Sequence, residues 1–460
     1  MVPRKVSPPC KNVTESNSST LQPVDTMKLE GSLDHADASS MKSIIANLRP
    51  NLQQYESLYK RIHANPELSH QESETAALIE HFLRDLSPKF EIRTKIGGHG
   101  LIAILRHGPG KTVLLRADMD ALPVAEKTGL DYSSRRSQLD AQRKKTAVMH
   151  ACGHDMHVVC LLVAAETLLA AHDLWSGTIV FLFQPAEEAG DGALGMVDDG
   201  LFDPIRHACP LPDMVLAQHV APIRAGMVVT KLGPIMSSSD SLKVTIFGRG
   251  GHGSMPHRCI DPVVIASHIV VRLQTIVSRV VAPDAVAVIT VGSIHAGEAD
   301  NVICDQAFFT VNIRTLDETV RQTVLENVKK TITAECTAGN CERPPQIEHC
   351  MSIPLTSNTA APHQELCHVF REYFSPSFQV AEKSSLASED FSILASSIGK
   401  PYYFWLFGGT ESKLWDSLMA SNQLEKLPIN HSPEFAPAIH PTMQTGADAM
   451  TVAVLAILRK

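Results

Sequence analysis

Short apolar runs bounded by turn residues mark the first half of the chain. Residues 101–105, 112–117, 178–183 and 214–217 are runs of this kind. Such short stretches, apolar on consecutive positions, are typical of strands that are buried on both faces. Residues 158–171 are also nearly all apolar but too numerous for one strand, so they predict a buried helix. The alternation of strands and helices indicates an α/β sheet flanked by helices.

Residues 223–355 show a different order of predicted strands and helices. Asp261 and Pro262 supply an N-cap and a first-turn proline for one helix, and Thr315 with Glu318 could form the capping box of another. The expected elements are, in order, a strand at 241–247, a helix at 262–281, strands at 285–294 and 307–313, a helix from Glu318 onward and a strand at 347–353. This β-α-β-β-α-β order predicts a ferredoxin-like unit inserted into the α/β domain.

The length of 460 residues exceeds what one hydrophobic core supports, so at least two domains are expected. Residues 1–40 are rich in Ser, Thr, Pro and charge, which predicts a disordered tail. Residues 41–222 and 356–460 should together form the catalytic domain, with a last helix near residues 446–458. Residues 223–355 should form an inserted dimerisation or lid domain.

Charge and cysteine usage narrow the class of protein. The net charge of −8 offers no basic surface for nucleic acid or an anionic membrane, and no apolar run approaches the roughly 20 residues of a membrane span. The N-terminus lacks the apolar core of a signal peptide. Ten cysteines without a C-x-x-C pair favour free thiols, and a glycan on the sequon at Asn430 would crowd a candidate metal ligand, so we expect a cytoplasmic protein.

The densest chemistry lies at residues 149–157, Met-His-Ala-Cys-Gly-His-Asp-Met-His. A thiol, three imidazoles and a carboxylate fall within nine residues, and the pair Glu187-Glu188 follows about thirty residues later. Thiolate, imidazole and carboxylate are the side chains that bind divalent transition metals. One glutamate can be a ligand and the other a base, so the two segments predict a hydrolytic metalloenzyme.

Acidic and imidazole side chains follow three predicted strands. Asp118 and Asp120 come after residues 112–117, the glutamate pair after 178–183, and His219 after 214–217. The ligand crevice of an open α/β sheet lies at the carboxyl ends of its strands, so these groups should converge on one edge.

Six segments together resemble the binuclear metal amidohydrolases of peptidase family M20, which include aminoacylases, hippurate hydrolases, indole-acetyl-amino-acid hydrolases and small carboxypeptidases. The resemblance covers nearly everything from about residue 45 onward. The segments occur in the family's order and are Arg116-Ala117-Asp118-Met119-Asp120-Ala121-Leu122-Pro123, residues 149–157, residues 184–192, residues 250–257, Ser388-Glu389-Asp390-Phe391 and His431-Ser432-Pro433.

The resemblance implies two divalent metal ions per subunit, zinc or manganese and alternatively cobalt. Its implied metal ligands are Cys152, His154, Glu188, His219 and His431. Cys152 would bridge the ions as thiolate. Glu187 would be the general base that takes a proton from the attacking water and passes it to the departing amine. Asp120 would orient one of these metal ligands without binding an ion itself.

The resemblance also implies a homodimer with sites completed between subunits. His252 in the inserted unit would reach a neighbouring active site and stabilise the tetrahedral oxyanion. Asn301 and Arg314 would hold the carboxylate of a small-molecule substrate. Cys304 stands where the family commonly has proline.

Some assignments stay open at the level of sequence. His150 and His157 are as compatible with support of the site as with a direct role, and Asp118 could simply close a turn. The basic run from Arg135 to Lys145 belongs to a connection longer than is usual in the family. It suits a solvated loop or an altered entrance to the site.

Three functions are compatible with these residues. The first is hydrolysis of N-acyl amino acids or short peptide-like amides with a free carboxylate. The second is a dedicated N-acetyl deacetylase of a biosynthetic pathway. The third is a non-catalytic dimeric binding protein, against which the adjacent glutamates argue, because a binding scaffold needs no such pair.

Overall fold

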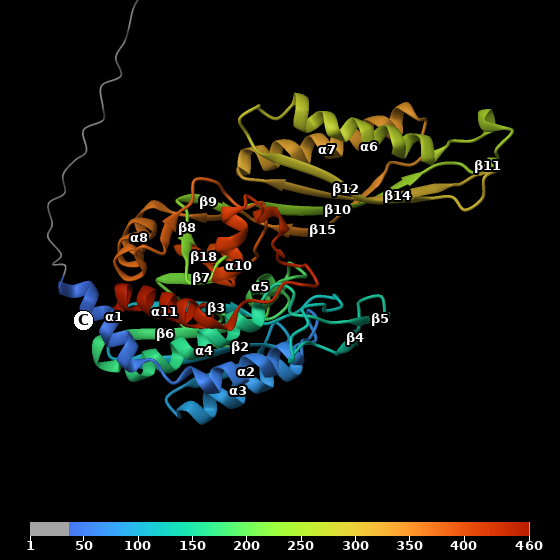
Figure 1. Cartoon of the computed structure of the whole chain (residues 1–460). Coiled ribbons are helices and arrows are strands. Elements are labelled where there is room, and N and C mark those ends of the chain that lie inside the picture. The colour runs from blue at the N-terminus through green and yellow to red at the C-terminus, as the bar shows by residue number, and fades with distance from the viewer. Residues whose placement is uncertain (1–35, 460) are drawn as a thin grey trace, which may run out of the picture.

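The computed structural model describes residues 36–459, and within them the largest sheet has the strand order β1-β2-β6-β3-β7-β18-β8-β17 (Figure 1). Its strands are β1 Glu91–Ile96, β2 Gly100–His107, β3 Thr112–Asp118, β6 Gly177–Gln184, β7 Met214–Arg224, β8 Val228–Thr230, β17 Phe378–Val380 and β18 Tyr402–Thr410. Strands β6, β3, β7 and β18 pair in parallel, while β1 and β2 add an antiparallel edge. The carboxyl ends of the parallel strands therefore meet at one edge of the sheet.

Helices cover both faces of this sheet because its strands are apolar on both. In β2, Leu101, Ala103 and Leu105 enter one core, while Ile102 and Ile104 enter the other. The first core is shared with α1 Ala36–Leu48, α2 Leu52–Ala64, α3 Ser73–Leu86, α4 His154–Ala170, α8 Ala360–Phe374 and α11 Ile439–Leu458, and the second with α5 Gly192–Asp198 and α9 Ser392–Ser396. Helix α10, Ser412–Ala420, lies beside β7. The predicted α/β class is confirmed.

The predicted ferredoxin-like unit is present as a second sheet with its own core. Its four strands lie in the order β12-β14-β10-β15, all neighbours antiparallel, and α6 and α7 cover one face (Figure 1). The elements are β10 Ser238–Phe247, α6 Pro262–Arg279, β12 Ala287–Ala296, β14 Gln306–Thr315, α7 Glu318–Ala338 and β15 Gln346–Ile353. The predicted capping box of α7 is wrong, because Thr315 still pairs in β14. The side chain of Asp317 caps the helix by accepting the N–H of Val320.

Three two-stranded pairs and three short 3₁₀ helices complete the described chain. The pairs are β4 Ser137–Leu139 with β5 Lys145–Ala147, β9 Gly233–Met236 with β16 Thr356–Asn358, and β11 Gly251–His252 with β13 Val302–Ile303. The 3₁₀ helices are His172–Leu174, Pro256–Arg258 and Leu424–Lys426. The pair β9–β16 lies where the chain enters and leaves the second sheet, whereas β11–β13 lies at the far end of the inserted unit (Figure 1).

The division into domains at residues 223 and 355 stays a prediction. Strand β8 pairs with β18 and β17 in the large sheet, so the large sheet extends past residue 222 and the second sheet begins at Ser238. Most of the predicted tail, residues 1–35, lies outside the described residues, and its last part already belongs to α1, which begins at Ala36. Among residues 36–459 we find no helix that combines the length and apolarity of a bilayer span.

Candidate metal centre

The five predicted metal ligands meet at the carboxyl edge of the parallel strands. His154 is the first residue of α4, His219 lies in β7, and Glu188 follows β6, while the other two, Cys152 and His431, are on loops. Gly153 allows the sharp turn between Cys152 and the start of α4. Its φ is +84°, and a Cβ added there would come within 2.5 Å of the Val220 side chain.

Donor atoms of these residues are spaced as ligands around an ion. Cys152 Sγ lies 3.4 Å from His219 Nε2, and Glu188 Oε1 lies 3.3 Å from His431 Nε2 and 3.8 Å from His154 Nε2. Tetrahedral ligands at ordinary zinc distances would be separated by about 3.4 Å. Glu188 belongs both to a group with Cys152 and His431 and to a group with His154 and Glu187. The arrangement can therefore hold divalent ions.

Two buried atoms of the site make no hydrogen bond to any described residue, which supports the fit of a cation. They are His154 Nε2 and Glu188 Oε1. Burial, followed by the charges of Glu188 and Glu187, raises the pKa of the Cys152 thiol well above its usual value. Burial and the neighbouring charge of Glu389 likewise raise the pKa of Glu187. Such a crowd of negative groups is relieved by positive charge, which a divalent metal supplies.

The two inner imidazoles are held in the tautomer that metal binding requires. His154 Nδ1 lies 3.2 Å from Asp120 Oδ1, and His219 Nδ1 lies 2.7 Å from the carbonyl of Val220. Each ring therefore donates through Nδ1 and turns the lone pair of Nε2 into the site. Asp120 does more than was predicted, because its second oxygen accepts the N–H of Glu188 at 3.0 Å and the hydroxyl of Ser69 at 2.7 Å.

The contacts of His157 and Asp118 favour support of the site, although both lie in a group with His154 and His219 whose ligand atoms are close together. His157 Nδ1 lies 2.5 Å from Asp118 Oδ1, while its Nε2 accepts the N–H of Val220 at 2.8 Å. With both nitrogens engaged, His157 has no lone pair left for a metal. Its ring instead packs edge-on against His219, with centroids 4.5 Å apart. His150 is buried, and neither of its ring nitrogens hydrogen-bonds to a described residue.

Sequence reasoning missed a buried cation beneath the site. Arg116 is fully buried and donates to Asp118 at 2.8 Å, Glu389 at 2.8 Å and Asp390 at 3.3 Å. Although burial acts to raise it, the charge of Arg116 and of two histidines holds the pKa of Asp118 well below its usual value. All three acidic partners lie in segments that were quoted for the resemblance, Asp118 in one and the other two in another, so the signal was present without a role attached to it.

Sequence reasoning also missed Asn430, the neighbour of His431. Its side-chain amide donates to the carbonyl of Cys152 and to that of Val220, both at 3.2 Å. His431 itself has φ +72°, a left-handed conformation that is uncommon for histidine. Asn430 thus binds the loop of His431 to the segments that carry Cys152 and His219.

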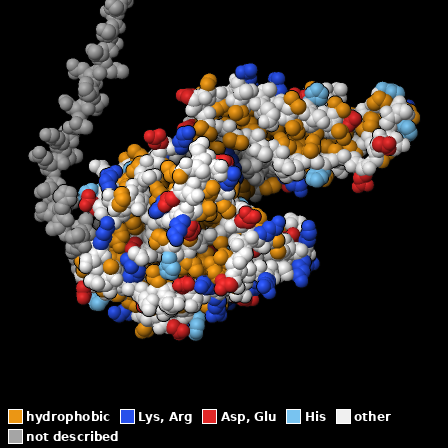
Figure 2. Space-filling view, in the orientation of Figure 1, with side chains coloured by type: hydrophobic (Ala, Val, Ile, Leu, Met, Phe, Trp, Pro, Cys, Tyr) orange, Lys and Arg blue, Asp and Glu red, His pale blue; other side chains and the backbone are white. Residues whose placement is uncertain are grey.

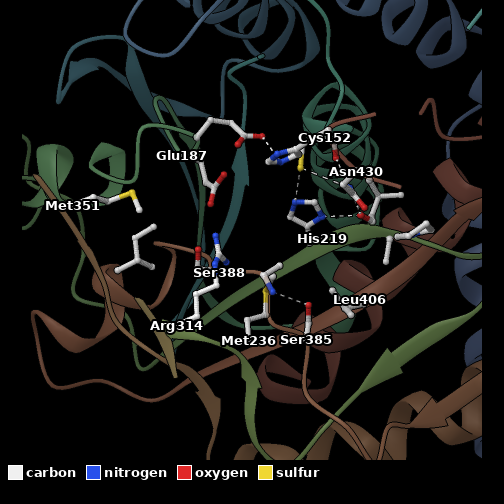
Figure 3. Close-up of a pocket in the computed structure, with 17 residues that line it drawn as sticks. Cys152, Glu187, His219, Met236, Arg314, Met351, Ser385, Ser388, Leu406 and Asn430 are labelled. Carbon is white, nitrogen blue, oxygen red and sulfur yellow. Dashed lines mark hydrogen bonds and ion pairs between the residues drawn. The ribbon is translucent and has the colours of Figure 1, made fainter. Parts of the chain in front are cut away.

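A cavity of about 300 Å³ opens beside the cluster. Cys152, Glu187 and His219 line one part of it, and Arg314 extends into it from the inserted unit (Figure 3). The remaining wall is largely apolar and includes Met236, Met351, Ile353 and Leu406. A pocket of this size and lining suits a small molecule with an apolar part.

Arg314 makes no ion pair within the described part of the chain. Its Nη1 donates to the carbonyl of Leu386 at 2.7 Å and its Nε to Asn312 at 3.1 Å. Burial alone lowers the pKa of Arg314. A half-buried guanidinium with free donors in a pocket can receive a carboxylate.

His252 and Asn301 do not reach this pocket within the chain. They lie side by side at the tip formed by β11 and β13, where Gly253 donates to the carbonyl of Asn301 at 2.8 Å, and both are exposed. The tip is at the end of the inserted unit away from the large sheet (Figure 1). The structure therefore does not bring Asn301 and Arg314 together in one chain.

The basic run from Arg135 to Lys145 is ordered as the hairpin β4–β5. Lys and Arg side chains gather on it beside the hollow that separates it from the inserted unit (Figure 2). Arg136 pairs with Glu74 at 2.7 Å, and Gln138 accepts the N–H of Leu68 at 2.7 Å. The hairpin is thus bound to the segment between α2 and α3 and to the first turn of α3.

Comparisons with known proteins agree with this geometry. The sequence profile of peptidase family M20/M25/M40 matches residues 114–431. A hippurate hydrolase of Campylobacter jejuni is 37% identical over 341 residues, which cover 74% of this chain and 84% of the relative. An N-acetyl-L-cysteine deacetylase of Bacillus subtilis is 40% identical over 302 residues, 65% of this chain and 66% of the relative.

The fold is shared with a protein of known structure. A crystal structure from methicillin resistant Staphylococcus aureus matches with a TM-score of 0.74 at 29% identity, over 92% of this chain and 99% of the other. Coverage this wide takes in both sheets.

Proposed function

The chain belongs to peptidase family M20/M25/M40 and is a metal-dependent amidohydrolase, and from this premise we propose that it hydrolyses the amide bond of N-acyl amino acids that carry a free carboxylate. The observation that carries the proposal is Arg314. A guanidinium without an acidic partner in the described chain lines the same cavity as Glu187 and the candidate ligands. Anchoring the substrate carboxylate there would direct the scissile carbonyl toward the metal centre.

We propose that Cys152, His154, Glu188, His219 and His431 hold two divalent ions. Support comes from the two donor groups that share Glu188 and from the imidazole tautomers set by Asp120 and Val220. When bound, the ions would polarise the substrate carbonyl and lower the pKa of the attacking water. A site of thiolate, imidazole and carboxylate suits zinc, manganese or cobalt and is too soft for magnesium or calcium.

Glu187 is the base in this mechanism. Its carboxylate lines the pocket, and its Oε2 lies 3.9 Å from His154 Nε2, at the inner edge of the candidate cluster. From there it takes a proton from the attacking water and returns it to the nitrogen of the departing amino acid. Asp120 holds two proposed ligands in place, because it hydrogen-bonds to the ring of His154 and to the backbone N–H of Glu188.

Completion of the site calls for a second copy of the chain. The tip that carries His252 and Asn301 also exposes Met255 to 42% and Val302 to 56%. Beside the unpaired edge of β12, helix α6 exposes Val264 to 52% and Val271 to 70%. An edge strand flanked by apolar helix positions suits pairing between copies. We propose a homodimer in which the tip of one subunit supplies His252 and Asn301 to the pocket of the other.

A cytoplasmic location is part of the proposal. The nine cysteines within residues 36–459 are all free thiols, and Cys152 must stay reduced to bind metal. The amide of Asn430 donates to two carbonyls of the site, so a glycan on that amide would disrupt the loop of His431. Both features suit a reducing compartment without glycosylation.

The test compares kcat/KM for a benzoyl amino acid, the matching acetyl amino acid and the methyl amide of the benzoyl substrate, all with added divalent metal. The proposal expects the methyl amide to be at least about 10-fold worse, because it leaves Arg314 unpaired. Equal values for the acid and its amide would remove the carboxylate clamp. Turnover confined to the acetyl compound would favour the dedicated deacetylase.

A further inference from the structure

The segment between α2 and α3, residues 65–72, contacts the metal centre from behind and contributes no ligand. The N–H of Ala121 donates to the carbonyl of Glu67 at 2.8 Å, so the segment runs beside the loop that follows β3. The hydroxyl of Ser69 donates to Asp120. This segment therefore supports Asp120, whose carboxylate hydrogen-bonds to both His154 and the N–H of Glu188.

Glu72, the last residue of this segment, reaches the turn that carries the two active-site glutamates. Its side chain is fully buried, and its Oε1 accepts the N–H of His70 at 2.9 Å and the N–H of Ala186 at 2.8 Å. Both donors have left-handed backbones, with φ values of +65° at His70 and +52° at Ala186. One carboxylate oxygen thus joins two non-glycine residues of uncommon conformation.

The conformation of Ala186 matters because Glu187 is the next residue. A left-handed alanine is unfavourable and persists only where the surroundings hold it. The turn is fixed on its other side by the N–H of Glu188, which donates to Asp120 at 3.0 Å. Two carboxylates therefore hold the backbone around the pair Glu187-Glu188: Glu72 accepts the N–H of Ala186, and Asp120 accepts the N–H of Glu188.

A plain structural role for Glu72 as a helix cap does not fit its contacts. Glu72 stands at the N-cap position of α3, yet its side chain makes no capping hydrogen bond. Glu67 does that work, because its carboxylate accepts the N–H of Thr75 at 2.7 Å and of Glu74 at 3.1 Å. The two glutamates of one loop thus divide the roles, with Glu67 on the helix and Glu72 on the active-site turn.

We propose that Glu72 is a positioning residue for the general base: by accepting the N–H of Ala186 it holds the left-handed turn that directs Glu187 into the pocket. The inference rests on the function proposed above, since it concerns the base of that reaction. Burial, followed by the charge of Asp120, raises the pKa of Glu72 to about 8. Its Oε2 has no hydrogen-bond partner among the described residues, so Oε1 can accept whether or not the other oxygen carries a proton. Glutamine keeps that acceptor and alanine does not.

The experiment compares Glu72→Ala, Glu72→Gln and the control Glu67→Ala in the metal-loaded enzyme. We expect Glu72→Ala to lower kcat about 100-fold, the usual cost of a misplaced catalytic group, with KM and metal content unchanged. Glu72→Gln should stay close to wild type. Glu67→Ala should lower the melting temperature while the folded enzyme keeps its kcat. If Glu72→Ala does not fold, Glu72→Asp replaces it, because the shorter side chain withdraws the acceptor from Ala186.

Hydrogen exchange of peptides that span residues 184–192 provides a readout independent of turnover. Exchange there should become faster in Glu72→Ala or Glu72→Asp and remain unchanged in Glu72→Gln and Glu67→Ala. Unchanged exchange in the alanine and aspartate variants, or a glutamine variant as impaired as the alanine one, would overturn the inference. A wild-type protein that cleaves no N-acyl amino acid would instead reject the proposed function, and the exchange data would still decide the role of Glu72.

Discussion

The two ends of the proposed active site differ in how completely one chain builds them. At the large sheet, His154, His219 and Glu188 are held by neighbours whose own positions are fixed by buried hydrogen bonds. At the tip of the inserted unit, His252 is exposed, and among the described residues its ring bonds only to Ser254, two residues away. The first region is preorganised within the chain. The second carries His252 and Asn301, but the pocket of the same chain does not include them. Catalysis in this molecule should therefore depend on folding at one end and on assembly at the other.

The largest effect should come from the preorganised end. Glu187→Gln removes the base but no proposed ligand, so we expect kcat to fall about 10³-fold or more while metal content persists. Glu188→Gln removes the negative charge of a carboxylate that belongs to two donor groups, so it should lose metal as well as activity. Metal analysis of both purified variants beside wild type makes the distinction. Equal metal loss in the two would mean that the roles within the pair are assigned wrongly.

The assembled end should respond differently. His252→Ala alone should lower kcat about 100-fold through the lost oxyanion contact, without changing metal content or melting temperature. Mixing it with Glu187→Gln should restore part of the activity, because one site of a mixed dimer would then contain both residues. Recovery is measured after subunit exchange has been verified with a labelled partner. Proven exchange without recovery would show that the histidine does not act between subunits.

These two ends also differ in how far the sequence could predict them. Asp118, Asp120, Glu187 and Glu188 were placed together from the strands they follow, because parallel strands end at one edge. His219 was expected just after its strand and lies within it, since β7 continues to Arg224 after its pairing with β3 stops at Ala217. The role proposed for the tip requires a second copy of the chain, and no periodicity within the sequence encodes how two copies would meet.

The supports of the site were beyond sequence reasoning for a different reason. Asn430 and Glu72 act through backbone groups of distant segments, and such contacts depend on loop conformations rather than on residue types. The strand at Tyr402–Thr410, a central member of the sheet, was also missed, although it begins with an apolar run like those of the other buried strands. Its pairing with Met214–Arg224 and Val228–Thr230 joins segments that are far apart in the sequence. Contacts of this kind become visible only once the fold is in place.

Arg314 connects the two regions, because it is part of the inserted unit but lines the pocket of its own chain. Arg314→Lys should raise KM for a free-acid substrate at least about 10-fold, since an ammonium lacks the planar fork that matches a carboxylate. The same substitution should hardly affect the methyl amide of that substrate. Asn301→Ala is the informative companion, because its effect should depend on dimer formation and the effect of Arg314→Lys should not. Parallel losses on acid and amide would assign Arg314 a structural role.

The last effect, and the smallest on turnover, concerns stability at the preorganised end. His63 is buried between Asp155, at 2.6 Å, and Glu126, at 3.1 Å. Although burial acts to lower it, the charges of these two partners raise the pKa of His63 to about 9. A raised histidine pKa contributes stability that is fully present below its unfolded value and is lost as the pH rises through the folded value. Between pH 6.5 and about 9 the free energy of unfolding should therefore fall by up to about 3 kcal/mol.

The variant His63→Gln tests this origin of the pH dependence. It should be less stable than wild type at pH 6.5, and its free energy of unfolding should change less over that pH range, which melting curves of the metal-loaded proteins will test. His81→Gln is the matched control, because His81 and Asp85 form an exposed pair at 3.2 Å that should contribute little. A pH profile of His63→Gln that runs parallel to wild type would rule out His63 as the origin of the alkaline loss.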